Sequence, residues 1–569
     1  MKTLSGLAAS TGIAIGPLFI YRPVGLTVKR RRVGDPEAEN QRYLAARTRV
    51  AEALRLMAER LENDGQEEEA AIFEIQIEFL EDPTYGEAIS DRILGEAINA
   101  EGATAAVGAE LIEEFSEVED DYFAQRTADI DDLNRRLLKT LMGVTDDPLA
   151  QIAEPSIVLA PDLTPSDTAS IDRDRVLALV TEVGSATSHT AILSRGLGIP
   201  SIVGLGELPQ NDGVQAIVDA VKGLLIIDPD PQTLSEYQKR KADFDARRGQ
   251  LVAEARKPAV TIDGHEIEMV ANIGNVAEAR QSMEFGAEGV GLLRTEFLFL
   301  ERPELPSEDE QYQIYRQIVD VYGQRPVIVR TLDVGGDKNL PSVEMPVEQN
   351  PFLGQRAIRL ALADQDRLLI PQLKALLRAA VDRNVKIMFP MVATAGEIRN
   401  LQAGLAAART ELNREGVPFG SAVEIGIMVE IPAAAVSAHR LAPLVDFFSI
   451  GTNDLTQYTL AADRTNERVA ALADYFDPAV LDLIRMVIDG AHSAGKWVGM
   501  CGEMAGDPLA IPLLLGLGLD EFSMSPSAVP DAKDRVRRLS REECRVLAGE
   551  CLECTDASAV RSLLEARSG

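Results

Sequence analysis

The stretch DFFSIGTND, residues 446–454, decides the fold of this chain. A short apolar run, 446–451, stops at two polar side chains, Asn453 and Asp454. The same pattern recurs from about residue 260 onward, and helical stretches separate the apolar runs. We count eight such runs: 268–273, 289–296, 327–333, 386–391, 424–430, 446–451, 497–501 and 521–525. Eight βα units over about 300 residues predict a closed parallel (β/α)8 barrel of the TIM type.

In such a barrel, the chemistry gathers at the C-terminal ends of the strands. The residues expected at these ends are mostly polar: Asn272, Arg294, Glu296, Arg330, Asp333, Glu430, Asn453, Asp454 and Cys501. Met391 ends the fourth strand. Guanidinium groups bind phosphate and carboxylate bidentately, so Arg294, Arg330 and Arg464 predict a site for a small phosphorylated acid. Glu430 and Asp454 facing a phosphate need a cation between them, and Mg²⁺ suits a site of oxygen ligands. Each arginine alone is more often a surface or salt-bridge residue; their coincidence at strand ends favours a site.

The four cysteines are too few for a disulfide framework in 569 residues, which indicates a reducing compartment. Cys501 lies in GMCGEM, residues 499–504. A lone cysteine in an apolar strand is usually a core residue, but above a metal–phosphate site it can donate a proton. The spacing of Cys551 and Cys554 could suit redox or metal chemistry, but the stretch is helical and no histidine follows, so packing is the favoured explanation.

One of the four histidines, His189, lies in GSATSHTAILSR, residues 184–195. Thr187 and Ser188 favour a helix N-cap, which places His189 in the first turn. Free N–H groups and the helix dipole there favour an anion and disfavour the imidazolium. This predicts a neutral, nucleophilic histidine that can carry a phosphoryl group. The alternative is a surface histidine that merely begins a helix.

In the N-terminal half, segments with strand-like patterns alternate with segments of helical pattern. Residues 1–22 and about 144–227 read as strands and turns, whereas 36–142 read as helix and 231–256 as a charged connecting helix. A helical block between two β-rich pieces predicts an insertion into one α/β domain. Its acidic surface is either a solvated face or a docking face for a basic partner.

Charge and hydropathy exclude some classes of protein. The net charge of −33 argues against nucleic acid as the main partner. No run reaches the roughly 18 apolar residues of a membrane span, so no membrane insertion is expected. The first 16 residues do not resemble a signal peptide.

At these residues the chain resembles Enzyme I, the phosphoenolpyruvate–protein phosphotransferase family of the bacterial sugar phosphotransferase system. The resemblance covers essentially the whole length. Its motifs are the segment 6–17, the helical insertion, Thr187-Ser188-His189, GLLRTEF (291–297), RTLDVGGDK (330–338), NPFLG (350–354), GTNDLTQ (451–457) and GEMAG (502–506).

The resemblance implies a domain plan. Residues 1–22 and 144–228 form a phosphohistidine swivelling α/β domain, and residues 23–143 form a helical-bundle insertion that binds the phosphocarrier HPr. Residues 229–259 form a linker helix, and residues 260–569 form the barrel that binds phosphoenolpyruvate and dimerises. The resemblance also implies a cytoplasmic enzyme that performs the first step of sugar uptake.

The resemblance implies a role for each site residue. The phosphoryl acceptor is His189, through its Nε2, and the proton donor to the enolate of pyruvate is Cys501. The two Mg²⁺ ligands are Glu430 and Asp454. The residues that bind phosphoenolpyruvate are Arg294, Arg330, Asn453, Asp454 and Arg464.

One departure and three rivals accompany this interpretation. The family usually has Gly-Gly-Arg before Thr-Ser-His, whereas this chain has Gly184-Ser185-Ala186, which removes a possible phosphate contact. The nitrogen-regulatory paralogue is an alternative, but it typically carries an extra N-terminal sensory domain. Phosphoenolpyruvate synthase and pyruvate phosphate dikinase need an ATP-binding domain, and no Gly-rich loop precedes residue 144. A purely regulatory binding protein would not need the full set of catalytic residues.

Overall fold

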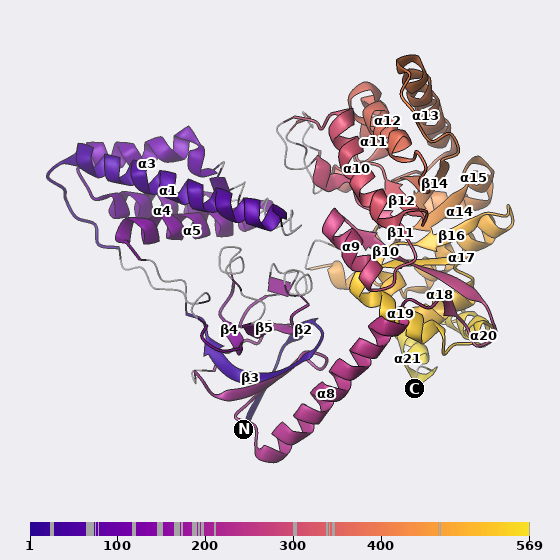
Figure 1. Cartoon of the computed structure of the whole chain (residues 1–569), viewed down its shortest axis with the longest axis horizontal. Helices are drawn as coiled ribbons and strands as arrows, with labels where there is room; N and C mark the ends of the chain where they lie inside the picture. The colour runs from indigo at the N-terminus through magenta and orange to yellow at the C-terminus, as the bar shows by residue number, and fades with distance from the viewer. Residues whose placement is uncertain are drawn as a thin grey trace. The chain divides into compact units, whose positions relative to one another are not determined.

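The computed structural model describes residues 1–22, 28–63, 73, 76–77, 79–116, 121–144, 149, 152–163, 171, 175–184, 190–191, 194, 198–209, 212–299, 304–336, 340, 342–343, 348–464, 466 and 468–567. The chain divides into two compact units, Met1–Arg248 and Gly249–Gly569. Figure 1 labels their helices and strands.

The first unit contains one eight-stranded sheet. Its strands, in spatial order, are β1 (Lys2–Ser5), β8 (Leu224–Ile227), β7 (Gln215–Asp219), β3 (Ile13–Ile20), β4 (Ser156–Ala160), β5 (Val176–Thr181), β6 (Ser201–Val203) and β2 (Leu7–Ser10). β3 pairs with β4 in parallel, with Leu18 opposite Ile157. The two β-rich pieces therefore form one sheet, and the helical block between them is an insertion, as the sequence predicts.

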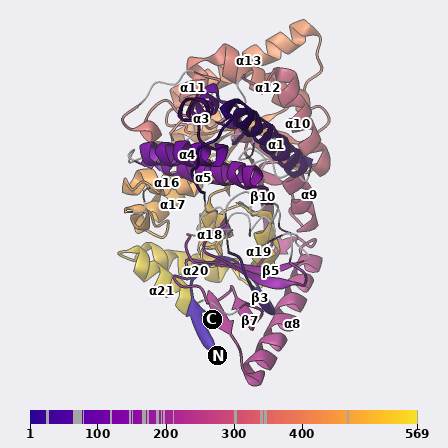
Figure 2. The same cartoon turned by 90° about the vertical axis from the view of Figure 1, so that its left-hand side faces the viewer.

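The insertion is a bundle of helices. These are α1 (Pro36–Asn63), α3 (Pro83–Glu96), α4 (Ala100–Ser116) and α5 (Asp121–Met142), which lie side by side in Figures 1 and 2. α3 begins where the Asp82 side chain accepts a hydrogen bond from the Thr84 N–H, with proline at the first helical position. Tyr43, Leu54 and Ile89 are fully buried in the bundle core, apart from the core of the sheet.

The charged segment predicted as a connecting helix forms α8 (Pro231–Glu254). Its N-terminal half packs on the sheet of the first unit through Tyr237. Arg240 there binds the fully buried Asp219, with 3.0 Å between Nη2 and Oδ2. Just beyond the C-terminal end of α8, the Ala255 carbonyl accepts a hydrogen bond from the buried Lys533.

The second unit is a closed barrel of eight parallel strands. In chain order, which is also the spatial order, they are β10 (Glu266–Ile273), β11 (Val290–Leu293), β12 (Val327–Arg330), β13 (Val385–Phe389), β14 (Glu424–Val429), β15 (Phe447–Ile450), β16 (Trp497–Met500) and β17 (Glu521–Met524). Pairing of β10 with both β17 and β11 closes the ring. All eight predicted strands are confirmed.

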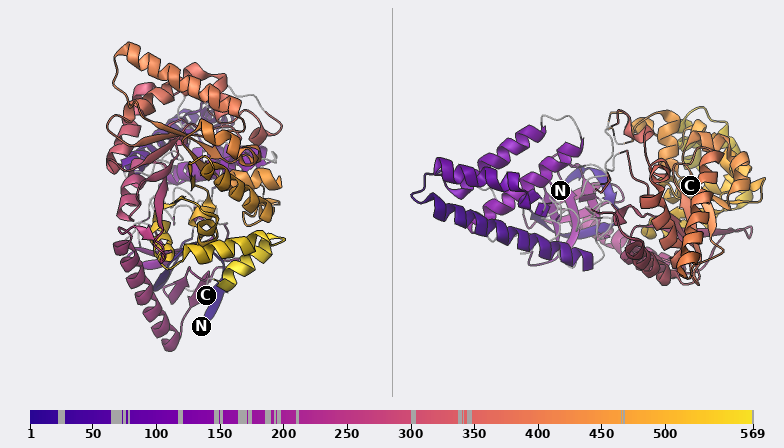
Figure 3. Two further views of the ribbon diagram at one scale, coloured as in Figure 1. Left: turned by 90° about the vertical axis from the view of Figure 1, so that its right-hand side faces the viewer. Right: turned by 90° about the horizontal axis from the view of Figure 1, so that it is seen from above.

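Helices surround this barrel, as Figure 3 shows. They are α9 (Val276–Glu284), α10 (Glu308–Tyr322), α11 (Ile358–Ala363), α12 (Ile370–Ala379), α13 (Ala395–Glu415), α14 (Pro432–Val436), α15 (Ala438–Leu441), α16 (Thr452–Leu460), α17 (Pro478–His492), α18 (Ile511–Leu517), α19 (Val529–Val536), α20 (Arg541–Leu552) and α21 (Ala557–Arg567). A short strand, β9 (Ala259–Val260), pairs antiparallel with β10. No helix in the described ranges has the length and apolar character that a membrane crossing requires.

An apolar cluster of side chains lies inside the barrel below the predicted site. Leu292, Ile328, Met388 and Met428 form a buried cluster that also includes Cys501. Several predicted strands end earlier than the sequence suggests, so that Glu296 begins a short 3-10 helix (Glu296–Leu298) beyond β11 and Asp333 lies in the loop beyond β12. Arg330 is the last residue of β12, and the other two lie beyond their strands, so all three are at the C-terminal end of the barrel above this apolar cluster.

Candidate functional site

Arg330 is the centre of a buried group of charges at the C-terminal end of β12. Its Nη2 lies 3.0 Å from Oε1 of Glu296, and its Nη1 lies 3.0 Å from Oδ2 of Asp333. All three residues are buried. Burial disfavours the charged guanidinium, but the two carboxylates outweigh it and raise the pKa of Arg330 above its usual value. Arg330 is therefore a fixed cation.

Arg356, which the sequence analysis missed, connects Asp333 to Asp454. Its Nε and Nη2 lie 2.9 and 3.1 Å from the Asp333 carboxylate oxygens. Its Nη1 and Nη2 lie 3.1 and 3.2 Å from those of Asp454. The only signal in the sequence was its position two residues after the NPFLG motif.

Glu430 follows β14 directly and is 1% exposed. Its Oε1 accepts a hydrogen bond from the Met391 N–H, with an N–O distance of 2.6 Å. Met391 adopts a φ of 55°, a left-handed conformation that is uncommon outside glycine. Burial, followed by the negative charges of Asp454 and Asp333, raises the pKa of Glu430 to about 8. The carboxyl group thus lies in a site with a surplus of negative charge.

The remaining predicted substrate-binding residues border this group. The Arg464 Nη2 lies 3.9 Å from Oδ2 of Asp454, and its side chain is 38% exposed. Asn453 forms two hydrogen bonds with Glu503: its Nδ2 donates to the carboxylate at 3.3 Å, and its Oδ1 accepts from the backbone N–H at 3.1 Å. Arg294 is exposed at the end of β11, and no carboxylate of the described segments lies within ion-pair distance of it.

Cys501 follows β16 and is buried, with its Sγ 3.8 Å from the Ile450 carbonyl oxygen. The Asn272 side chain donates a hydrogen bond of 2.9 Å to the Cys501 carbonyl. Burial raises the pKa of the thiol to about 11. The sequence argument assumed an ordinary thiol. The buried thiol is a weaker acid than that, but it holds its proton throughout the neutral range.

His189 and the residues 185–188 before it lie outside the described residues. Just after it, Thr190 and Ala191 are helical and buried. The Ser194 hydroxyl donates a hydrogen bond to the Thr190 carbonyl at 2.6 Å. The role of His189 therefore stays a prediction from the sequence.

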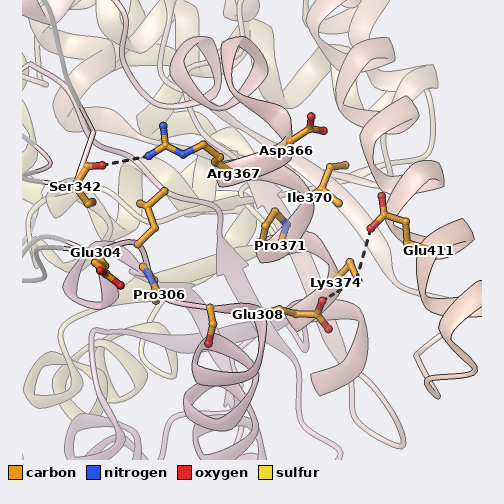
Figure 4. Close-up of a pocket in the computed structure, with 12 residues that line it drawn as sticks. Glu304, Pro306, Glu308, Ser342, Asp366, Arg367, Ile370, Pro371, Lys374 and Glu411 are labelled. Carbon is orange, nitrogen blue, oxygen red and sulfur yellow. Dashed lines mark hydrogen bonds and ion pairs between the residues drawn. The ribbon is translucent and has the colours of Figure 1, made fainter.

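A cavity of about 660 Å³ in the barrel unit is a separate feature (Figure 4). It lies among loop residues 304–307, α10, α12 and α13, and none of the predicted site residues lines it. Its charges are largely paired with one another: Nζ of Lys374 lies 2.8 Å from Glu308 and 2.9 Å from Glu415, and Arg367 reaches the Ser342 carbonyl. This cavity is not the predicted substrate site.

Comparison with known proteins agrees with this architecture. Family profiles described as the N-terminal, mobile and PEP-binding domains of PEP-utilising enzymes match residues 5–126, 152–223 and 248–541. A phosphoenolpyruvate–protein phosphotransferase of Bacillus sp. (strain S) is 45% identical over 566 residues, which is 99% of this chain and 98% of that protein. The enzyme of the same name from Bacillus subtilis (strain 168) is 43% identical over 545 residues, 95% of each chain. The chain belongs to the phosphoenolpyruvate–protein phosphotransferase family.

Membership in this family confirms the resemblance and makes the chain an enzyme of phosphoenolpyruvate-dependent phosphotransfer. Every residue of the Arg330–Asp454 group lies inside the segment that matches the PEP-binding domain. A solution structure of Enzyme I (nEIt) is 33% identical and covers 42% of this chain and 99% of its own, with a TM-score of 0.38.

Proposed function

We propose that this phosphotransferase takes the phosphoryl group of phosphoenolpyruvate onto His189 and passes it to a histidine of a small HPr-like phosphocarrier. Pyruvate is released, and the relay is the first step of phosphoenolpyruvate-dependent sugar uptake. The observation that carries the proposal is the buried group of arginines and carboxylates at the C-terminal ends of β12, β14 and β15.

The arginines of this group suit an anionic substrate. Arg330 is buried, and its Nε has no hydrogen-bond partner among the described residues. A buried donor without a partner is costly, and a phosphate or carboxylate oxygen would satisfy it. Arg294 and Arg464 keep their guanidinium groups exposed at the rim, where they can close on the phosphoryl group. Asn453 and Asp454 complete the proposed substrate-binding set.

The proposed cofactor is Mg²⁺, with Glu430 and Asp454 as its ligands. The described residues contain no ready-made group of three His, Cys, Asp or Glu ligands. Mg²⁺ is commonly bound by only one or two carboxylates together with waters and substrate oxygens. Four buried carboxylates, those of Glu296, Asp333, Glu430 and Asp454, face two buried guanidinium groups, so the residues fit a divalent cation. Bound there, the ion would supply electrostatic stabilisation of the charge that develops on the substrate oxygens.

A nucleophile, His189, and a proton donor, Cys501, complete the proposed mechanism. Neutral His189 attacks phosphorus through Nε2, an N–P bond forms as the P–O bond to the enol oxygen breaks, and the enolate of pyruvate is left. Cys501, which is protonated at neutral pH, gives its proton to the methylene carbon, and the thiolate regains a proton from water. Arg330 and Arg464 hold the phosphoryl oxygens during the transfer.

We propose the same domain plan that the resemblance implies. Residues 1–22 and 144–228 carry His189, 23–143 bind the carrier, 229–259 link the units, and 260–569 bind phosphoenolpyruvate and dimerise. All four cysteines are free, in line with the proposed cytoplasmic location. The relatives carry the general phosphotransferase name, so the nitrogen-regulatory alternative is not favoured.

The test is transfer of labelled phosphate from phosphoenolpyruvate. Wild type and the control His439→Ala, which changes an exposed barrel histidine, should form an acid-labile, base-stable phosphoprotein and pass the label to HPr. His189→Ala should retain its fold and take up no label. Acid-stable label, or label retained in His189→Ala, would contradict the assignment. Transfer only to the nitrogen-type carrier would instead support the regulatory alternative.

A further inference from the structure

Arg356 joins two acidic residues of different loops, and the mechanism above gives it no role. Asp333 follows β12, whereas Asp454 lies in the first turn of α16. The guanidinium presents its donors in a rigid planar fork, and Arg356 directs one edge at each carboxylate. A lysine has no equivalent geometry, because its ammonium group is a single point of charge.

Further contacts hold Arg356 in this place. It is 5% exposed, and its Nη1 donates to the Tyr458 hydroxyl at 3.2 Å. That hydroxyl donates in turn to the Phe352 carbonyl at 2.6 Å, which ties α16 to the loop that carries Arg356. Asp454 and Tyr458 are four residues apart and therefore share one face of α16. Arg356 is thus held by both ends of the same helical turn.

The backbone around Arg356 shows the same constraint. The next residue, Ala357, has a φ of 55°, and its N–H donates to the Val334 carbonyl at 2.9 Å. A Cβ at Gly335 would lie 2.9 Å from the Arg356 Cα, and Gly335 itself has a φ of 105°. Left-handed alanine is strained and persists where the surrounding structure fixes it. The loop therefore keeps an unfavourable backbone in order to place Arg356 beside Asp333.

The bidentate contact leaves Asp454 able to bind something else. Each carboxylate oxygen has two lone pairs, and Arg356 uses one on each oxygen. The remaining lone pairs lie in the plane of the carboxylate and stay available to a further ligand. Replacing a side chain that holds a metal ligand in place by hydrogen bonds typically weakens metal binding about 10–100-fold.

We propose that Arg356 is a positioning residue that orients the Asp454 carboxylate and couples it, through Asp333, to the substrate-binding Arg330. The inference rests on the proposed function, because it takes Glu430 and Asp454 as the divalent-cation site. It assigns Arg356 no contact with the substrate. As a consequence, one network of ion pairs positions both the proposed metal ligand Asp454 and the substrate-binding Arg330.

The test measures binding of free Mn²⁺ by electron paramagnetic resonance, without substrate. Arg356→Gln removes the fork and should weaken Mn²⁺ binding about 10–100-fold. Arg356→Lys keeps the charge but not the fork and should recover only part of that loss. Arg367→Gln is the control, because this exposed arginine pairs with Asp364 at the edge of the cavity and should bind Mn²⁺ as the wild type does. Trp497 fluorescence during urea unfolding verifies that each variant is folded.

The outcomes separate the inference from the function on which it rests. Glu430→Gln should abolish Mn²⁺ binding; if it binds like the wild type, the proposed metal site itself is wrong. If Glu430→Gln loses the ion but folded Arg356→Gln keeps wild-type affinity, the role of Arg356 is refuted and the metal site stands. If Arg356→Lys restores affinity fully, charge alone matters and positioning is refuted. Should Arg356→Gln fail to fold, Arg356→Lys alone decides.

Discussion

Glu521 should make the stability of the barrel depend on pH. It is the first residue of β17 and lies opposite Glu268 of β10 in the parallel pairing. Glu521 is 2% exposed, and its Oε1 accepts no hydrogen bond from any residue that the structure describes. Burial, followed by the charge of Glu268, raises its pKa from 4.5 to about 8. Glu268 as a residue is exposed, but partial burial of its carboxyl group raises its pKa as well. Glu521 therefore retains its proton at neutral pH.

The direction and size of the effect follow from proton linkage. Between about pH 4.5 and 8 the folded barrel holds a proton on Glu521 that the unfolded chain has released, so the free energy of unfolding falls as pH rises. The stabilising contribution is complete below the unfolded pKa and is lost as pH rises through the folded pKa. At about 1.4 kcal/mol per pKa unit, the ceiling is about 5 kcal/mol. Water penetration reduces such values, and we expect about 2–4 kcal/mol.

The perturbation is Glu521→Gln, which has nearly the shape of the protonated acid and cannot ionise. Relative to the wild type, it should gain stability as pH rises from 5 to 8, and its stability should fall less steeply with pH, because Glu430 still contributes its own part of the pH dependence. Trp497 is the only tryptophan and stacks on Phe447 at 4.6 Å within the barrel, so its fluorescence reports unfolding of this unit. Urea titrations at pH 5, 6, 7, 8 and 9 give the free energies.

Glu266→Gln is the matched control, because Glu266 is an exposed residue of β10 and should leave the wild-type pH dependence unchanged. The reasoning is refuted if the wild type shows no loss of stability between pH 5 and 8, or if Glu521→Gln loses stability with the wild-type slope.

Three further predictions concern other buried groups. Cys501→Ser should bind phosphoenolpyruvate normally but lose about two or more orders of magnitude in pyruvate formation, since general-acid catalysis is worth that much; unchanged turnover would return Cys501 to a packing role. Lys533→Met should destabilise the barrel by about 3 kcal/mol in urea titrations, because it leaves Glu288 and the Ala255 carbonyl without their partner; a loss below about 1 kcal/mol would contradict this. Arg240→Met should leave the buried Asp219 without its ion-pair partner and increase hydrogen exchange in the N-terminal half of α8; wild-type protection there would show that the ion pair is dispensable.

The sequence predicted the elements well because their signals are local. Each barrel strand is a short apolar run, and the polar residues that follow it, such as Glu430 and Asp454, mark the end where parallel strands place their side chains together. The same logic identified the helical insertion between β3 and β4. Helix ends, N-caps and strand lengths depend on residues within a few positions of one another.

Arg356 shows what such local patterns leave out. Its partners Asp333 and Asp454 are 23 and 98 residues away, and it lies on a loop rather than at a strand end. The properties of Cys501 illustrate the same limit: its position was predicted, but its raised pKa comes from burial by side chains of other strands.

The sequence by itself determined the order of the elements, the closed parallel barrel and most of the polar residues that gather at its mouth, because hydrophobic periodicity and turn chemistry act between near neighbours. Only the tertiary structure decided which carboxylate binds which arginine, that Glu430 is buried with its pKa raised to about 8, and that Arg356 lies between Asp333 and Asp454. The physical reason is that desolvation and charge pairing depend on distances across the folded barrel, which no local pattern of residues contains.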